Sequence, residues 1–151
     1  MTLKDWAAKH NLAEEKPSRE ELGELLKLAD EKIKDCEVIS GAAVSLDTYH
    51  SNVYAISLPL ATAPLRAEGY RTPKASDGGH SLLFQALTLT VDMKQKYSSP
   101  LQEARKTRNQ TAYSSSVGSH NKPDIDKFFA TVRELRADVE KWLRKEHPEL
   151  M

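Results

Sequence analysis

The sequence predicts an all-α protein, an up-and-down bundle of four long helices preceded by a short N-terminal helix. Apolar side chains recur at spacings of three and four residues along almost the whole chain, which is the period of an amphipathic helix. Strand alternation is convincing nowhere, and the nearest case, LTLTV at residues 87–91, lies inside a helical pattern. A length of 151 residues suits one domain, so we expect residues 1–151 to form a single domain, with an N-terminal extension (1–17) and a bundle (18–147).

The first two predicted helices lie near the N-terminus. Residues 3–12 are amphipathic, and we expect them to pack on the chain's own core, with a partner protein as the alternative. The residues KPS break this segment, and Ser18 with Glu21 is typical of a capping box that starts the next helix. That helix runs to about Val38, with an apolar stripe of Leu22, Leu25, Leu26, Ala29, Ile33 and Cys36.

The next long helix begins near Ser45 and has the widest apolar face, so we expect it to be the most buried. Two prolines, Pro59 and Pro64, lie inside it. Because an interior proline removes a backbone hydrogen bond and costs about 3 kcal/mol, we expect a kink or a break at these residues. Gly69 is a natural helix stop after them.

Three more helices follow in the prediction. One covers residues 79–96, and the next begins after Ser99, which is placed to cap it, with Pro100 at its first position. The last covers residues 123–147, and its apolar stripe is Ile125, Phe128, Phe129, Val132, Leu135, Val139, Trp142 and Leu143.

Composition limits the classes of function. The chain has 22 basic and 22 acidic residues, which argues against broad, charge-driven coating of nucleic acid. Residues 100–122 are an exception, because they hold four basic residues and one acidic residue, Glu103. The longest apolar run is far below the ~18 residues of a membrane span. With one cysteine, Cys36, and no signal peptide pattern, we expect a cytoplasmic protein.

The segment LQEARKTRNQTAY, residues 101–113, combines helical spacing with an unusually polar face. Arg105, Asn109 and Tyr113 recur at spacings of four, and Arg108 lies beside them. Arginine offers a planar fork of donors suited to phosphate, and tyrosine can stack on a base. This set suits one phosphate or nucleotide. The alternative is a solvated face or a set of structural ties, and the residues alone favour that alternative.

The stretch RKTRNQTAY resembles the signature of the HEPN superfamily, the helical "higher eukaryotes and prokaryotes nucleotide-binding" domains. Their fourth helix carries an Arg, a polar residue, three variable residues and a His. Arg108 and Asn109 match the start, and Tyr113 stands where the His would be. The chain is most similar to a bacterial branch with the motif R-x-x-R-N-x-x-x-Y. EGYR at residues 68–71 and GGHSLL at residues 78–83 resemble neighbouring parts of the family pattern.

The resemblance implies a homodimer whose motif helices face a shared cleft. It also implies a metal-independent endoribonuclease, in some members a toxin paired with a nucleotidyltransferase antitoxin, with no cofactor. In such an enzyme Arg108 would hold the scissile phosphate, and the His would be the acid or base. Tyr113 replaces that His, and its pKa of about 10, against about 6.5 for histidine, makes it a poor base at neutral pH. We therefore expect an RNA-binding or nucleotide-binding protein with weakened catalysis.

Other residues leave alternatives open. His80, behind two glycines, is expected to line or cap a helix start, but it is also a candidate to replace the missing His and to bind the ligand. No histidine or cysteine pair shows metal-ligand spacing, so we expect no metal. Two other hypotheses remain, a ribonuclease toxin that uses Arg108 with Tyr113 or His80, and a helical dimerisation module with no role in nucleic-acid binding.

Overall fold

The computed structural model describes residues 1–73, 78–113 and 121–151, with the backbone alone for residues 111–113. Most of the described chain is helical, which confirms the all-α class. Its α-helices are α1 (Leu3–Lys9), α2 (Arg19–Ile39), α3 (Leu46–Ala67), α4 (Gly78–Leu87), α5 (Ser98–Tyr113) and α6 (Lys122–Glu146). A 3-10 helix, η1 (Pro148–Leu150), follows α6.

A small two-stranded sheet was not predicted. β1 (Ala13–Glu14) pairs antiparallel with β2 (Tyr70–Arg71), so that Ala13 lies opposite Arg71 and Glu14 opposite Tyr70. Strands of two residues are too short for a pattern of alternation to reveal them. The pairing fixes the N-terminal segment against the chain that leaves α3.

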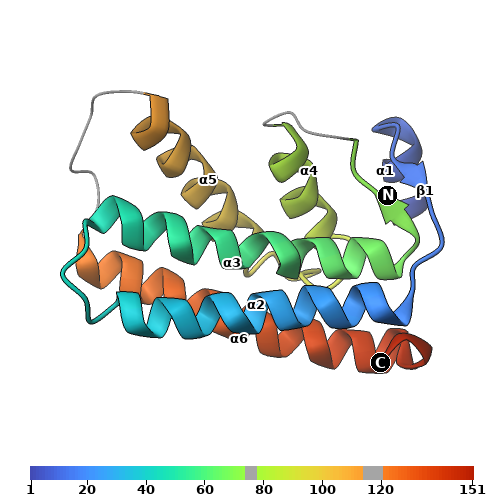
Figure 1. The fold of residues 1–151 in the computed structure, drawn as a ribbon. Coiled ribbons are helices and arrows are strands. Elements are labelled where there is room, and N and C mark those ends of the chain that lie inside the picture. Colours follow the sequence, from blue (N-terminus) through green and yellow to red (C-terminus); the bar gives the residue numbers. More distant parts are fainter. Residues whose placement is uncertain (74–77, 114–120) are drawn as a thin grey trace.

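The helices form two groups on either side of α3 (Figure 1). α2 and α6 lie alongside α3, whereas α4 and α5 contact α3 and each other and are inclined to it. This arrangement does not confirm the predicted up-and-down bundle of four long helices. α3 is the central helix, and the prediction that it is the most buried is confirmed, because most of its side chains from Tyr49 to Ala67 are buried.

α3 runs through both prolines without a break. Pro59 and Pro64 lie inside one continuous helix, so the expected break is wrong, and the expected kink is not confirmed. Both proline rings are packed in the interior of the protein, where burial of apolar surface offsets the lost backbone bonds. The hydroxyl of Thr62 donates to the Leu58 carbonyl at 2.7 Å between the two prolines.

α4 is shorter than predicted. It ends at Leu87, and residues 88–94 form turns in place of the helix expected up to residue 96. The hydroxyl of Thr88 donates to the Gln85 carbonyl at 2.6 Å, and the hydroxyl of Thr90 donates to the Ala86 carbonyl at 3.3 Å. The same two carbonyls also accept from the backbone N–H groups of Thr88 and Leu89 at 3.1 and 3.0 Å, so the helix ends in tighter i→i+3 turns to which the threonine hydroxyls add further bonds.

The start of α5 is also different from the prediction. The helix begins at Ser98, and the carboxylate of Asp92 accepts from the backbone N–H groups of Lys96, Tyr97 and Ser98 at 2.5, 2.9 and 2.7 Å. Asp92 is buried, so this carboxylate does the capping that was expected of Ser99. α6 begins at Lys122 behind the cap residue Asn121, close to the predicted start.

The N-terminal segment packs on the chain's own core, as predicted. Trp6, Ala7 and Leu12 are buried and belong to the hydrophobic core. The same core holds most of the α6 stripe, from Ile125 to Leu143. α1 and α6 are therefore parts of one packed interior.

Candidate functional site

Two of the predicted site residues contact Tyr54, a tyrosine of α3 that is 1% exposed. The Tyr54 hydroxyl lies 3.0 Å from Nδ1 of His80, in the first turn of α4. The guanidinium carbon of Arg108, on α5, lies 5.3 Å from the centre of the Tyr54 ring. Three helices thus each contribute one side chain, and we call Tyr54, His80 and Arg108 the Tyr54 cluster.

The Tyr54 cluster is held in place by its surroundings. Phe84, fully buried on α4, packs edge-on against the Tyr54 ring with 6.0 Å between ring centres. The face of a tyrosine ring attracts a guanidinium group, so the ring fixes the position of Arg108. Arg108 and His80 are only partly buried, so each has one side on the cluster and one open to solvent. A half-buried arginine fixed in this way is well suited to bind an anion.

Arg105 lies on the side of α5 that faces α4. Its Nε donates to the Gln102 side-chain oxygen at 2.9 Å, and Gln102 Nε2 donates to the Ser81 carbonyl at 3.0 Å. This chain of bonds joins α5 to α4 and orients Arg105. Asn109 is half-buried one turn further along α5. Tyr113 ends α5, and its side chain lies outside the described residues.

The structure therefore brings two of the predicted residues, His80 and Arg108, to one tyrosine. Sequence reasoning missed Tyr54 as a functional candidate, because it counted that residue only as part of a broad apolar face. A tyrosine on such a face is a signal in itself, since a buried hydroxyl needs a hydrogen-bond partner. Among the described residues, no group of three or more His, Cys, Asp or Glu side chains is placed to hold a metal ion.

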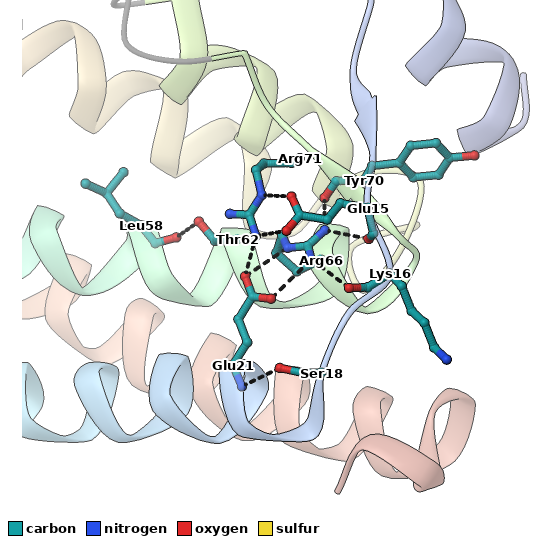
Figure 2. A network of polar contacts seen from close by, with 9 residues as sticks. All are labelled: Glu15, Lys16, Ser18, Glu21, Leu58, Thr62, Arg66, Tyr70 and Arg71. Atoms are coloured by element: carbon teal, nitrogen blue, oxygen red, sulfur yellow. Dashed lines mark hydrogen bonds and ion pairs between the residues drawn. The ribbon is translucent and has the colours of Figure 1, made fainter.

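A second polar cluster, around Arg66, was also missed (Figure 2). Arg66 is 1% exposed, and its Nε and Nη2 donate to the two Glu21 carboxylate oxygens at 2.9 and 3.1 Å. Its remaining N–H groups donate to the carbonyls of Glu15, Tyr70 and Lys16 at 3.0, 3.1 and 3.4 Å. All five donors of the guanidinium are thus used within the protein. Arg66 is a structural tie rather than a ligand-binding group.

Glu21 has a different role from the one predicted. The Ser18 hydroxyl accepts from the Glu21 backbone N–H at 3.1 Å, which confirms half of the capping box. The Glu21 carboxylate instead accepts from Arg66 and, at 3.0 Å, from Arg71. The Arg66 hydrogen bond lowers the pKa of Glu21. Because the folded-state pKa is depressed, this stabilisation is present at neutral pH and is lost as the pH falls through that pKa.

Two other candidates are core residues. Cys36 is buried, and burial raises the pKa of its thiol to about 11, so the reactive thiolate is absent at neutral pH. His50 is also buried, and its ring centre lies 5.5 Å from that of Phe128. The burial of Cys36 agrees with its place on the predicted apolar stripe of α2.

Compared with protein-family models, with curated proteins and with solved structures, this chain matches none. None of the described helices is long and apolar enough to cross a membrane. The functional proposal therefore rests on the Tyr54 cluster and on the motif residues of α5.

Proposed function

We propose that this chain is a HEPN-like protein that binds RNA or a nucleotide through the polar side of α5. The observation that carries the proposal is the position of Arg108, which is half-buried and fixed over the Tyr54 ring at 5.3 Å, while His80 contacts the hydroxyl of the same tyrosine. In this proposal Arg105, Asn109 and Tyr113 complete the ligand-binding side. Tyr113 in place of the motif histidine makes the protein a weak catalyst.

Partial burial is what makes Arg108 the central residue of the proposal. A guanidinium group at a half-buried position has already lost part of its hydration, so a phosphate competes with less water there than at an exposed lysine. The Tyr54 ring restricts the side chain before any ligand arrives, which lowers the entropic cost of binding. The hydrogen bond that Arg105 donates to Gln102 orients the Arg105 side chain in the same way.

The test is binding of a fluorescently labelled single-stranded RNA at low salt, followed by anisotropy. Arg108→Ala is expected to weaken binding about 10–100-fold, the worth of a charge-assisted hydrogen bond to phosphate. Lys106→Ala is the matched control, because Lys106 is exposed on the same helix and its loss removes the same charge. No binding by wild type at low salt, or equal effects of the two substitutions, would remove the proposal.

A second candidate, a ribonuclease toxin, is favoured by the contact between His80 and Tyr54. A histidine 3.0 Å from the Tyr54 hydroxyl shares this tyrosine with Arg108, and an acid or base near a phosphate bound by Arg108 would need such a position. Wild-type protein would then cleave RNA and arrest growth on expression. His80→Ala would slow cleavage by about 100-fold or more. Absence of cleavage by wild type leaves the binding protein as the better proposal.

A third candidate is a helical dimerisation module, in which Arg108 is only a structural tie to Tyr54. The same 5.3 Å contact favours it. Dimerisation without any RNA or nucleotide binding would favour the module.

The first proposal also includes a homodimer, a nucleotidyltransferase partner in a toxin–antitoxin or defence system, and a cytoplasmic location.

A further inference from the structure

A cavity of about 390 Å³ lies on the side of α5 that faces α6. α5 packs on α3 and α4 rather than on α6, which leaves this space between α5 and the first turns of α6. His50 of α3 lines it, together with Ala104 and Thr107 of α5 and Phe128 of α6. A volume in this range suits a small organic ligand.

The lining combines an aromatic surface with a polar rim. The rings of His50 and Phe128 lie 5.5 Å apart between centres and are inclined by 31°. His50 is 6% exposed, and Phe128 is only partly buried, so ring surface is available to a planar ligand at Phe128. Aromatic side chains of this kind are platforms on which nucleobases stack. The Thr131 hydroxyl donates to the Lys127 carbonyl at 3.0 Å, so its oxygen can act as an acceptor at the edge of the cavity.

The charges around the cavity disfavour a phosphate inside it. Glu103, Asp124 and Lys127 are its ionisable rim residues in addition to His50, and they carry one net negative charge when His50 is neutral. An anion would be repelled by the two carboxylates, whereas an uncharged ring would not. The cavity therefore suits the base of a nucleotide and not its phosphate.

The cavity lining and the Tyr54 cluster use neighbouring positions of the same two helices. On α5, Thr107 precedes Arg108 and Ala104 lies one turn before it. On α3, His50 lies one turn before Tyr54. Residues four apart on a helix are surface neighbours. The residues that line the cavity are therefore helix neighbours of the residues at which a phosphate would bind.

We propose that this cavity receives the nucleobase of the nucleotide or RNA residue whose phosphate Arg108 binds. The inference rests on the proposed function for the phosphate, but the base site has its own residues, Phe128, His50, Ala104 and Thr107. In this proposal one side of α5 binds the phosphate of the ligand and the other side binds its base.

The test is calorimetric titration of the full chain with adenosine and with AMP. Wild type is expected to bind both, with AMP bound more tightly. Phe128→Ala is expected to weaken both about tenfold or more, because it removes the stacking surface. Ala104→Leu fills the cavity and is expected to abolish both. Trp142→Ala removes another partly buried aromatic ring from α6, outside the cavity lining, and is the matched control.

A second measurement does not depend on the folding of the variants. Adenosine is expected to shift the imidazole proton signals of His50 in the NMR spectrum of wild type and to leave those of His147 in place. Unshifted His50 signals at saturating adenosine, or no binding of adenosine by calorimetry, would overturn the base site.

Different experimental results would contradict the base site and the phosphate site. If AMP binding depends on Arg108 but is unchanged in Phe128→Ala and Ala104→Leu, the base site is wrong and the proposed function stands. If adenosine binding depends on Phe128 while Arg108→Ala leaves AMP and RNA affinity unchanged, the base site stands and the phosphate role of Arg108 is wrong.

Discussion

Arg66 and Arg108 are two arginines in opposite situations. Arg66 is fully buried, and every donor of its guanidinium meets an oxygen of the protein. Arg108 is half-buried and rests on the face of an aromatic ring. The first arrangement holds the fold together, and the second keeps a cation accessible to a ligand. Residue type alone does not distinguish them, because environment decides what an arginine does.

The motif predicted a functional role for Arg108, but no local sequence pattern predicted the role of Arg66. Its carboxylate partner, Glu21, is 45 residues away in the chain, and its carbonyl acceptors carry no side-chain signature. Glu21 itself matched a local capping box, and that match did not indicate its ion pair with Arg66. Sequence spacing identifies partners within one helix turn, and it does not identify partners that only the tertiary fold brings together.

Asp92 carries a prediction at the residue scale. Its carboxylate accepts three backbone N–H groups at the start of α5, so Asp92→Asn is expected to lower the free energy of unfolding by about 1–3 kcal/mol. Asp35→Asn, on the exposed side of α2, is the control and is expected to change it by less than about 0.5 kcal/mol. Urea denaturation measures both. Equal stabilities of the two variants would show that Asp92 does not hold the start of α5.

At the scale of the elements, helix identity was more predictable than helix length. The apolar stripes of α2, α3 and α6 are long and regular, and all three helices lie where the pattern placed them. The end of α4 was missed, because Leu87 to Val91 continue the apolar pattern while the chain turns there in i→i+3 bonds, to which the hydroxyls of Thr88 and Thr90 add further bonds. Periodicity describes which face is buried, and it does not register such side-chain bonds.

The junction of β1, β2 and the end of α3 carries the prediction for the elements. Arg66→Met is expected to lower the free energy of unfolding by about 3–5 kcal/mol, since it removes the donor of three carbonyls and leaves Glu21 with Arg71 as its remaining partner. Arg71→Met is the matched control. Its side chain is 43% exposed, so its ion pairs with Glu15 and Glu21 are expected to contribute only about 0–1 kcal/mol. Comparable losses for both variants in guanidinium denaturation would contradict the structural role of Arg66.

At the scale of the whole molecule, the sequence predicted a helical protein but not the arrangement of its helices. α4 and α5 cover one side of α3 at an inclination, and α2 and α6 lie along the other side. The contacts of His80 and Arg108 with the same tyrosine follow from this arrangement, because α4 and α5 both pack on α3 at Tyr54. The cavity between α5 and α6 follows from it as well. The spacing of residues along one helix could not predict the contacts at Tyr54 or this cavity.

The polar side of α5 has a physical explanation at the same scale. Leu101 and Ala104 bury one side of the helix, and Gln102 joins it to α4, so α5 does not need a wide apolar stripe. The remaining side is left to Arg105, Arg108 and Asn109. We propose that this side is polar because it binds phosphate.

The salt dependence of RNA affinity tests this claim most directly. Each phosphate contact adds about 0.7 to the slope of log affinity against log salt for a single strand. Arg108→Ala is expected to reduce the slope by about 0.7 relative to wild type, and Lys141→Ala, an exposed site on α6, is expected to leave it unchanged. A slope and affinity in Arg108→Ala equal to those of wild type would contradict the account, because Arg108 would then be a structural tie to Tyr54 alone.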